Sequence, residues 1–516
     1  MNLLMDPIFR VESGTGIGTV SLPELMAYLG TDQVERLIGL QQHQHDAFHV
    51  FLCYLAGAVL ARRGISNPIQ PEEFWRTELL KLSGDHWGWE LVVDDLQKPG
   101  FMQVPLPPGS RPTSEAFSPD ALDVLQTAKN HDVKQARALK ANVDSWVYSL
   151  ISLQTMSGFL GRGNQGISRM NSGFGNRPIV ELMRSRRIGQ RWRDAVERLL
   201  LHREQVLQEP FGYDPQGLVL LWLEPWDGQE SLELSRLDPF YIEVCRRVRL
   251  VGKDGRIERA ELFSADKPRL AAKHLNGVVG DPWLPVDLKD AQQSSVKAFT
   301  FPAAGITAEH MRRLLFGDGV RLSTLQRPLA GWEGPLLFSV SVLVRGQGVT
   351  DGFHQYEVTV PEEKVPTIFG PAGADNSLED LSRTAITQVA EMQNRVLKPA
   401  VFTHILGAPA RLRLDHEFAS AAWTNIVRDF ELLWSADYFP WLWSVPASFN
   451  EDQELDRWTA ILHRHALTVL RQVEEAMPSH KGRQYLVKTK VRNVFWGAFY
   501  KNFNGRRQYS GPSSGS

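Results

Sequence analysis

The apolar positions along the chain separate a mixed first part from a helical second part. Up to about residue 360, short apolar or alternating runs typical of strands, at 218–223, 338–344 and 356–360, stand between long loops. After residue 376, apolar residues recur at spacings of three and four, which is the period of an amphipathic helix. We therefore predict an α+β protein, in which a large mixed N-terminal domain with short strands and long loops precedes a C-terminal four-helix bundle.

Local signals predict individual elements of the first part. Residues 8–12 predict a strand, which a glycine-rich turn joins to a second short strand. Ser21 and Glu24 have the spacing of a capping box, so a helix is expected to begin there. Further helices are predicted over 31–63, 121–128 and 144–156, whereas the proline-rich segment 97–120 and the glycine-rich segment 157–178 are predicted to be loops.

Prolines and glycines between residues 361 and 376 mark the predicted domain boundary. The resulting domains cover residues 1–365 and 376–505. Helical patterns in the second domain start at Ser377, near 415 and 481, and after Ser448. The low-complexity residues 510–516 predict a flexible tail of the kind that is appended for expression.

Composition excludes several classes of protein. The chain has 516 residues, 43% of them apolar, which excludes wholesale disorder and predicts at least two domains. A net charge of −2 excludes a uniformly basic nucleic-acid sleeve, although local basic patches stay possible. The longest apolar run, 50–61, is too short to span a bilayer, and the N-terminus lacks the basic region of a signal peptide. Cys53 and Cys245 are too few for a cysteine zinc site or a disulfide framework, so we expect a cytoplasmic protein.

Histidines supply the candidate metal chemistry. His45 and His49 are four residues apart, as in zincins, with His43 nearby, but Asp46 stands where zincins carry the catalytic glutamate and no third ligand is evident. The pair His131-Asp132 is of the kind through which some phosphohydrolases bind metal, but the histidines and aspartates that would accompany such a pair are not found around it. We expect no catalytic residues, no metal and no cofactor, so the chain is not predicted to be an enzyme. A metal-dependent hydrolase using His43, His45 and His49 is kept as an alternative.

Two basic stretches point to a polyanionic partner. Residues 158–193 contain eight arginines and one acid, Glu181, and residues 480–507 contain eight lysines and arginines, no acid, and interleaved aromatic residues. Such segregation in a nearly neutral chain is typical of nucleic-acid binding. The competing interpretation is that the acids lie on neighbouring elements. We expect phosphate contacts from Arg169, Lys488, Lys490 and Arg492, and a structural RNA-binding protein is a further alternative.

The chain resembles CasA, the large subunit of the type I-E CRISPR surveillance complex Cascade. The resemblance rests on the opening Asn2-Leu-Leu-Met-Asp-Pro-Ile-Phe-Arg-Val11, on Phe101-Met-Gln103, on the glycine loop that begins at Gly158-Phe159, and on the order of the two domains. Residues 163–178 resemble the corresponding stretch in a branch of the family that has a longer glycine loop. The resemblance covers nearly the whole chain, and the order of its motifs carries it.

The resemblance implies a non-catalytic, DNA-binding subunit in antiviral defence. Such a subunit recognises the PAM, the short motif beside the target, in double-stranded DNA. It helps to open the duplex so that crRNA can pair and form an R-loop, and it recruits a helicase–nuclease. The implied partners are the other Cascade subunits, the crRNA through the complex, the target duplex and the helicase–nuclease, without a membrane.

The resemblance also assigns roles to residues. PAM contacts are implied for Asn130, within a loop over 129–137, and for Gly158, Phe159, Leu160, Gly161, Arg162, Gly163 and Asn164. Gly346, Gln347 and Gly348 are similar to the family's glutamine wedge at a hairpin tip. The resemblance also implies a lysine finger before Asn276, and Lys267 and Lys273 are both candidates for it. The cysteine cluster that some members carry is replaced by residues 251–255, so no metal-stapled loop is expected.

Overall fold

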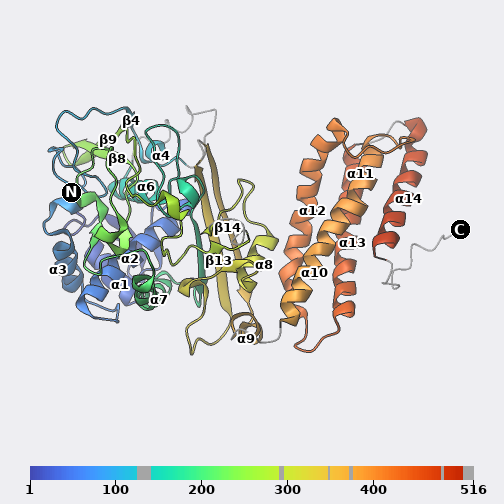
Figure 1. Cartoon of the computed structure of the whole chain (residues 1–516), viewed down its shortest axis with the longest axis horizontal. Helices are drawn as coiled ribbons and strands as arrows, with labels where there is room; N and C mark the ends of the chain where they lie inside the picture. The colour runs from blue at the N-terminus through green and yellow to red at the C-terminus, as the bar shows by residue number, and fades with distance from the viewer. Residues whose placement is uncertain (125–140, 290–295, 347–348, 371–375, 478–480, 504–516) are drawn as a thin grey trace. The chain divides into compact units, whose positions relative to one another are not determined.

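The structure is a computed structural model that describes residues 1–124, 141–289, 296–346, 349–370, 376–477 and 481–503. The chain divides into two compact units (Figure 1). Unit 1 contains Met1–Ile306 and Arg313–Glu362, and unit 2 contains Thr307–Arg312 and Glu363–Ser516. Within the described residues, no helix combines the length and the apolar character that crossing a membrane requires.

The chain begins with an antiparallel hairpin. Strands β1 (Phe9–Ser13) and β2 (Gly16–Val20) pair with Phe9 opposite Val20, and β3 (Arg36–Leu37) adds a third strand. Helix α1 (Leu22–Gly30) follows, and the Ser21 hydroxyl caps it by accepting from the N–H of Glu24 at 3.3 Å. These contacts confirm the predicted strand, turn and helix start.

Three helices form the centre of unit 1. Helix α2 (His45–Arg63) is buried along most of its length and packs against α6 (Val143–Met156) and α7 (Ile188–Gln208). The prediction for 144–156 is confirmed, but the helix predicted over 31–63 covers only its second half. A left-handed residue at Asp32 and the short strand β3 interrupt the first half. Of the helix predicted at 121–128, the described part holds only α4 (Pro119–Leu122).

The strands of unit 1 form small antiparallel sheets and one parallel pair. The strands predicted at 338–344 and 356–360 are confirmed as parts of β13 (Leu336–Gly346) and β14 (Val349–Val360), which pair with each other, while β5 (Pro178–Met183) pairs with β13. The run predicted at 218–223 is a strand only to Leu220. The remaining strands are β4 (Ser114–Ala116), β6 (Leu218–Leu220), β7 (Leu237–Ile242), β8 (Arg247–Lys253), β9 (Arg256–Phe263), β10 (Val286–Asp287), β11 (Lys297–Ala298) and β12 (Val320–Arg321).

The remaining helices before α10 belong mostly to unit 1, whereas α9 lies in unit 2 and α8 and η8 include residues of both units. They are η1 (Gln42–Gln44), α3 (Glu72–Ser83), η2 (Trp87–Trp89), η3 (Asn171–Gly173), η4 (Leu221–Leu223), η5 (Leu234–Arg236), η6 (Lys273–Leu275), α8 (Ala308–Phe316), η7 (Thr324–Gln326), η8 (Glu362–Lys364) and α9 (Val365–Phe369).

The described part of unit 2 is helical (Figure 1). Helix α10 (Ser377–Glu391) continues through a π-helical turn, η9 (Met392–Leu397), into α11 (Lys398–Ile405). The other helices are α12 (Glu417–Ser444), α13 (Glu451–Ala476), η10 (Lys481–Arg483) and α14 (Gln484–Asn502). Trp458 joins three of them, because its ring stacks on Trp441 of α12 at 4.8 Å and its indole N–H donates to the Ala385 carbonyl of α10 at 3.0 Å.

Candidate nucleic-acid interface

The glycine loop, residues 158–164, leaves the end of α6 and forms a closed turn. The N–H of Leu160 donates to the carbonyl of Asn164 at 3.1 Å, and the N–H of Asn164 donates to the carbonyl of Gly161 at 3.0 Å. Gly161 has a φ of +109°, and a β-carbon at this position would meet no atom within 4 Å. The tip of the loop therefore has a glycine conformation and open space around it, the two properties that close approach to a groove requires.

Two further segments of unit 1 hold the glycine loop in place. The N–H of Gly158 donates to the carbonyl of Arg345 at the end of β13, at 2.8 Å. The N–H of Ala265, just after β9, donates to the carbonyl of Gly163 at 3.0 Å. The loop is thus fixed between the β13–β14 hairpin and the segment that carries Lys267.

The hairpin end consists of Arg345, Gly346 and Val349, where β13 and β14 still pair through Gly346 and Val349. Gly346 and Val349 are therefore the last described residues of this antiparallel pair on either side of residues 347–348. Gln347 and Gly348 themselves lie outside the described residues, so the wedge role stays a prediction. A register shift between Val344 and Arg345 bends the strand just before this end of the pair.

Arg345 connects the hairpin end to the segment that precedes residues 125–140. Its side chain is 2% exposed, forms an ion pair of 2.6 Å with Asp123, and donates to the carbonyl of Val124 at 2.7 Å. The contact therefore fixes the last described residues before the loop that contains Asn130. Asn130 lies outside the described residues.

Asp123 is the acid at the centre of this anchor. His43 contacts its carboxylate at 2.8 Å, Gln44 donates to it at 2.8 Å, and Ser152 donates to it at 2.9 Å. Burial alone raises the pKa of the Asp123 carboxyl, but Arg345 and His43 outweigh burial and hold this pKa well below its usual value. Asp123 is therefore a buried anion that depends on Arg345 for part of its compensation.

Both candidate finger lysines lie on segments that contact the glycine loop region. Lys273 is exposed, and its Nζ atom stands 5.2 Å from the ring centre of Phe174, which in turn lies 5.1 Å from the ring of Phe159 in the glycine loop. Lys267 is also exposed and follows Ala265 by two residues. The structure therefore leaves the choice between the two lysines open.

The phosphate contact expected from Arg169 is wrong. Its side chain is 3% exposed, lies 3.6 Å from the carboxylates of both Glu243 and Asp281, and stacks on the ring of Tyr241 at 3.8 Å. Because it is buried among these partners, it cannot reach a phosphate outside the fold. Arg177 of the same stretch is also buried and forms an ion pair of 2.7 Å with Asp281.

Most of the other arginines between 158 and 193 also have acidic partners on other elements. These ion pairs are Arg184 with Asp194, Arg186 with Glu357, Arg187 with Asp32, and Arg191 with both Asp46 and Glu181. The competing interpretation of this stretch is therefore correct for these residues. Arg162, at the tip of the glycine loop, is exposed, and none of the described residues forms an ion pair or hydrogen bond with its side chain.

The three basic side chains predicted to contact phosphate on α14 differ in their surroundings. Lys488 and Arg492 are exposed, whereas Lys490 is partly buried and donates to the carbonyl of Pro409. The aromatic residues Phe495 and Phe499 are buried in the helical core of unit 2. Lys488 and Arg492 therefore suit a contact with a polyanion better than Lys490 does.

The histidines do not form a metal site in the described part of the chain. His43 contacts Asp123, His49 lies 3.5 Å from Glu181, and His45 is exposed. No cluster of three or more metal-ligating side chains occurs among the described residues. The hydrolase alternative therefore has no geometric support from His43, His45 and His49. His131 and Asp132 lie outside the described residues.

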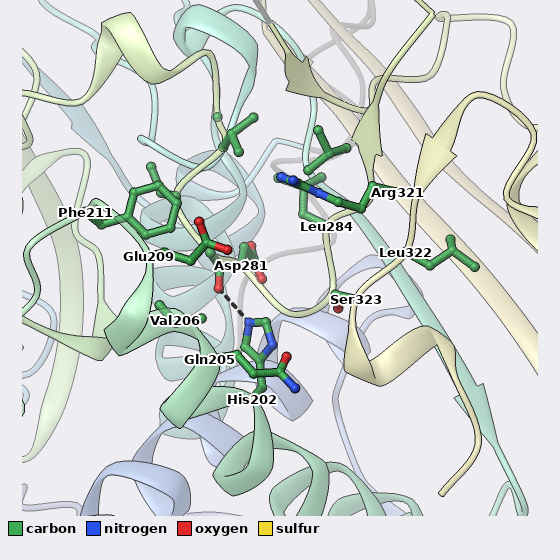
Figure 2. Close-up of a pocket in the computed structure, with 15 residues that line it drawn as sticks. His202, Gln205, Val206, Glu209, Phe211, Asp281, Leu284, Arg321, Leu322 and Ser323 are labelled. Atoms are coloured by element: carbon green, nitrogen blue, oxygen red, sulfur yellow. Dashed lines mark hydrogen bonds between the residues drawn. The ribbon is translucent and has the colours of Figure 1, made fainter. Parts of the chain in front are cut away.

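A separate cavity of about 180 Å³ lies in unit 1 (Figure 2). His202, Phe211 and Arg321 are among the residues that line it, and the Nε2 atom of His202 contacts the carbonyl of Gly280 at 3.0 Å. None of the site residues predicted from the sequence lines this cavity. It is therefore distinct from the glycine loop and the hairpin end.

The fold occurs in known proteins, although the sequence matches no protein-family model and no curated protein. Cse1 of Thermobifida fusca has a TM-score of 0.66 and 14% identity, and the match covers 98% of this chain and 99% of that chain. CasA of Thermus thermophilus has a TM-score of 0.64 and 15% identity, with 97% and 99% covered. A chain of a CRISPR RNA-guided surveillance complex has a TM-score of 0.59 and 14% identity, with 97% and 99% covered. The chain therefore has the CasA/Cse1 fold along nearly its whole length.

Proposed function

We propose that this chain is a CasA (Cse1) protein, the large non-catalytic subunit of a type I-E Cascade complex in the cytoplasm. The shared fold supports this proposal, and one observation carries it: the glycine loop, the hairpin end and the segment with Lys267 are joined by backbone hydrogen bonds. These hydrogen bonds hold together, within unit 1, the three elements to which we assign PAM recognition and duplex opening.

In this proposal the glycine loop enters the minor groove beside the target. The minor groove of B-DNA is about 6 Å wide, so the backbone at Gly161 approaches the base edges only without a side chain. Arg162 then holds a phosphate, and Lys267 or Lys273 reaches the same groove. Readout by backbone and small residues in this groove is degenerate, which suits recognition of a short motif.

The hairpin then opens the duplex. Gly346, Gln347 and Gly348 form the proposed wedge, and a side chain inserted at a base step costs a few kcal/mol of unstacking, which new contacts with the opened DNA offset. Pairing with crRNA, held by the other Cascade subunits, extends the R-loop. We further propose that residues 376–505 form a four-helix bundle that holds DNA backbone through Lys488 and Arg492, and that target binding recruits the helicase–nuclease.

Gly161→Leu tests this function in the assembled complex. The variant should lower the ratio of affinities for PAM and non-PAM duplexes by roughly tenfold or more, mainly by weakening the PAM duplex. Gly16→Leu is the matched control, because Gly16 has a φ of +113° and equally open space around its β-carbon position. Both variants place a leucine at a similar positive φ, but in this proposal only the first blocks a groove.

The measurement is the binding affinity for paired duplexes that differ only in the flanking trinucleotide, at fixed salt. Thermal unfolding of both variants shows whether the strain alone changes stability. If Gly161→Leu and Gly16→Leu retain the wild-type ratio, the glycine loop does not read the PAM and the proposed function fails at its central step.

A further inference from the structure

A cavity of about 310 Å³ lies beside the glycine loop in unit 1. It is distinct from the loop tip at Gly161, and its walls come from Phe159 of the loop, from residues that follow the loop, and from the segment that runs from Asp266 to the start of η6. They are Phe159, Gln165, Gly166, Ile167, Ser168, Ser172, Gly173, Phe174, Asp266, Pro268, Leu270 and Lys273. We call this cavity the base pocket.

We propose that the base pocket receives a single unpaired nucleobase of a DNA strand, an inference that rests on the proposed function because that function opens a duplex nearby. The volume lies at the small end of the range of ligand sites. Phe174 presents an aromatic face, because its side chain is 37% exposed and its ring lies 5.1 Å from that of Phe159. Stacking on such faces is the common way in which proteins hold unpaired bases.

The charges around the base pocket suit a nucleotide with its phosphate. Lys273 lines the pocket, and its ammonium stands over the Phe174 ring, 5.2 Å from the ring centre. A base that stacks on this face must displace the lysine side chain, whose four-carbon stem then lets the ammonium reach the phosphate of the same nucleotide. Arg162 and Lys267 are exposed nearby on the glycine loop and on the same wall segment. One acid, Asp266, also lines the pocket, and its carboxylate accepts from the Gln229 amide at 2.7 Å.

Three neutral side chains of the pocket, those of Gln165, Ser168 and Ser172, use donors within the fold. The Gln165 amide donates to the carbonyls of Ala265 and Asp266 at 3.0 and 2.9 Å. The Ser168 hydroxyl donates to Glu243 at 2.7 Å, and the Ser172 hydroxyl donates to the Oδ1 atom of Asn276 at 2.8 Å. These three side chains therefore offer oxygen acceptors, as does the Asp266 carboxylate, whereas the Lys273 ammonium is a charged donor of the pocket.

An acceptor-rich wall favours bases that carry an exocyclic amino group. Adenine, cytosine and guanine each carry such a group, whereas thymine has none and offers only its ring N3–H as a donor. Leaving the acceptors without donors costs binding free energy. We therefore infer that the base pocket prefers adenine or cytosine to thymine.

The connection with the hairpin end indicates where the unpaired base comes from. Gly158 starts the glycine loop, bonds to Arg345 of the hairpin end, and is followed by Phe159 in the wall of the pocket. A strand that separates at the hairpin thus has unpaired bases on the same connected surface. The proposed ligand of the base pocket is a base of the separated strand. A free nucleotide is the alternative that the test excludes.

Fluorescence of one 2-aminopurine within a dT15 strand tests the pocket on the full-length chain. Stacking on Phe174 should quench the fluorescence on binding, and Phe174→Ala should abolish the quenching and weaken binding by roughly five- to hundredfold. Phe117→Ala is the matched control, because Phe117 is an exposed phenylalanine of unit 1, at 66%, outside the pocket. Lys273→Gln should weaken binding of the strand more than Lys253→Gln, a change at an exposed lysine of β8.

Base preference supplies a second readout. The wild-type chain should bind dA15 and dC15 more tightly than dT15 at equal salt, and Phe174→Ala should reduce this preference. The fluorescence of free 2-aminopurine nucleotide should not be quenched at concentrations at which the fluorescence of the labelled strand is quenched. The reason is that contacts with the DNA backbone contribute to binding of the strand. Quenching that survives Phe174→Ala, binding without quenching, an absence of binding, or equal quenching of the free nucleotide would each overturn the inference.

The outcome separates this inference from the proposed function. If Gly161→Leu loses PAM discrimination while Phe174→Ala leaves single-strand binding and quenching unchanged, only the base pocket fails. If Phe174→Ala abolishes the quenching while Gly161→Leu retains discrimination, the pocket binds unpaired bases but the proposed PAM recognition is wrong.

Discussion

The backbone N–H of Gly158 donates a hydrogen bond of 2.8 Å to the carbonyl oxygen of Arg345. The side chain of the same arginine forms an ion pair of 2.6 Å with Asp123. One residue therefore joins the glycine loop, the hairpin end and the pair Asp123 and Val124. The glycine loop and the hairpin end carry residues proposed to recognise and open DNA, and their relative positions depend on a residue that is held by a buried ion pair.

Arg345→Met should destabilise the chain by about 3–5 kcal/mol, because it leaves the buried Asp123 carboxylate without its cation. Urea unfolding followed by tryptophan fluorescence at pH 7 measures the change. Arg186→Met is the matched control: Arg186 is 69% exposed, and its pair with Glu357 should contribute no more than about 1 kcal/mol. Equal effects of the two substitutions would show that the Arg345 pair is not an anchor.

The effect of Arg345→Met should also depend on pH. In the wild type the pKa of Asp123 is held well below its usual value. The ionised Asp123 carboxylate therefore stabilises the folded chain fully above about pH 4, and this contribution to the free energy of unfolding is lost as the pH falls toward the folded-state pKa. In the variant, Arg345 no longer holds the pKa of Asp123 down. His43 faces Asp123 in both proteins. The difference in unfolding free energy should therefore narrow when urea unfolding is repeated below pH 4, whereas a constant difference would contradict the assigned role of Asp123.

Local signals in the sequence predicted the elements that depend on local chemistry. The β1–β2 hairpin, the cap at Ser21, α6 and the helices of unit 2 follow from turns, caps and periodicity. The second part of 31–63 is helical as predicted, but residue 32 is left-handed and the first part is not helical. Helix α7, of 21 residues, is not among the predicted elements, although its hydrophobic pattern is amphipathic.

The candidate site was predictable only in part, because charge along a sequence does not show which side chains meet in space. The arginines of 158–193 looked like one basic surface, but Arg169 and Arg177 are buried beside Asp281, an acid about a hundred residues away. The glycines of the loop, in contrast, can be recognised directly in the sequence. The anchor between Asp123 and Arg345 joins residues far apart in the sequence, and no local pattern marks such a pair.

Arg162→Ala should weaken PAM and non-PAM duplexes by similar factors. Arg162 is exposed at the loop tip, so a phosphate contact by this residue adds affinity without sequence preference. The slope of log K against log[salt] should become shallower by about 0.9 if one phosphate contact is lost. Arg186→Ala should leave the slope unchanged, because Glu357 already neutralises Arg186. A change that affects only the PAM duplex would instead assign Arg162 to base readout.

On α14, the double variant Lys488→Gln/Arg492→Gln should flatten the salt dependence of DNA binding by roughly two units. Both side chains are exposed, which a phosphate contact requires. Lys490→Gln should change the slope much less, because Lys490 donates to the carbonyl of Pro409. Titrations with duplex DNA between about 50 and 200 mM salt, a range chosen to resolve the slope, compare the three proteins. An unchanged slope in the double variant would mean that the two residues only solvate the helix.

Gly166→Ala tests whether the shape of the glycine loop, and not only its tip, is needed. A β-carbon at Gly166 would collide with the carbonyl oxygen of Gly173, which accepts from the N–H of Phe159 at 2.9 Å. Because the obstacle is backbone, the loop must shift, and the Phe159 amide should exchange its hydrogen faster. PAM discrimination should fall together with the protection of the Phe159 amide against hydrogen exchange. In contrast, Gly18→Ala, in strand β2, places its β-carbon in open space without a positive φ and should leave the Phe159 amide protected. If Gly166→Ala exposes the Phe159 amide while PAM discrimination stays at the wild-type level, recognition does not depend on the closed form of the loop.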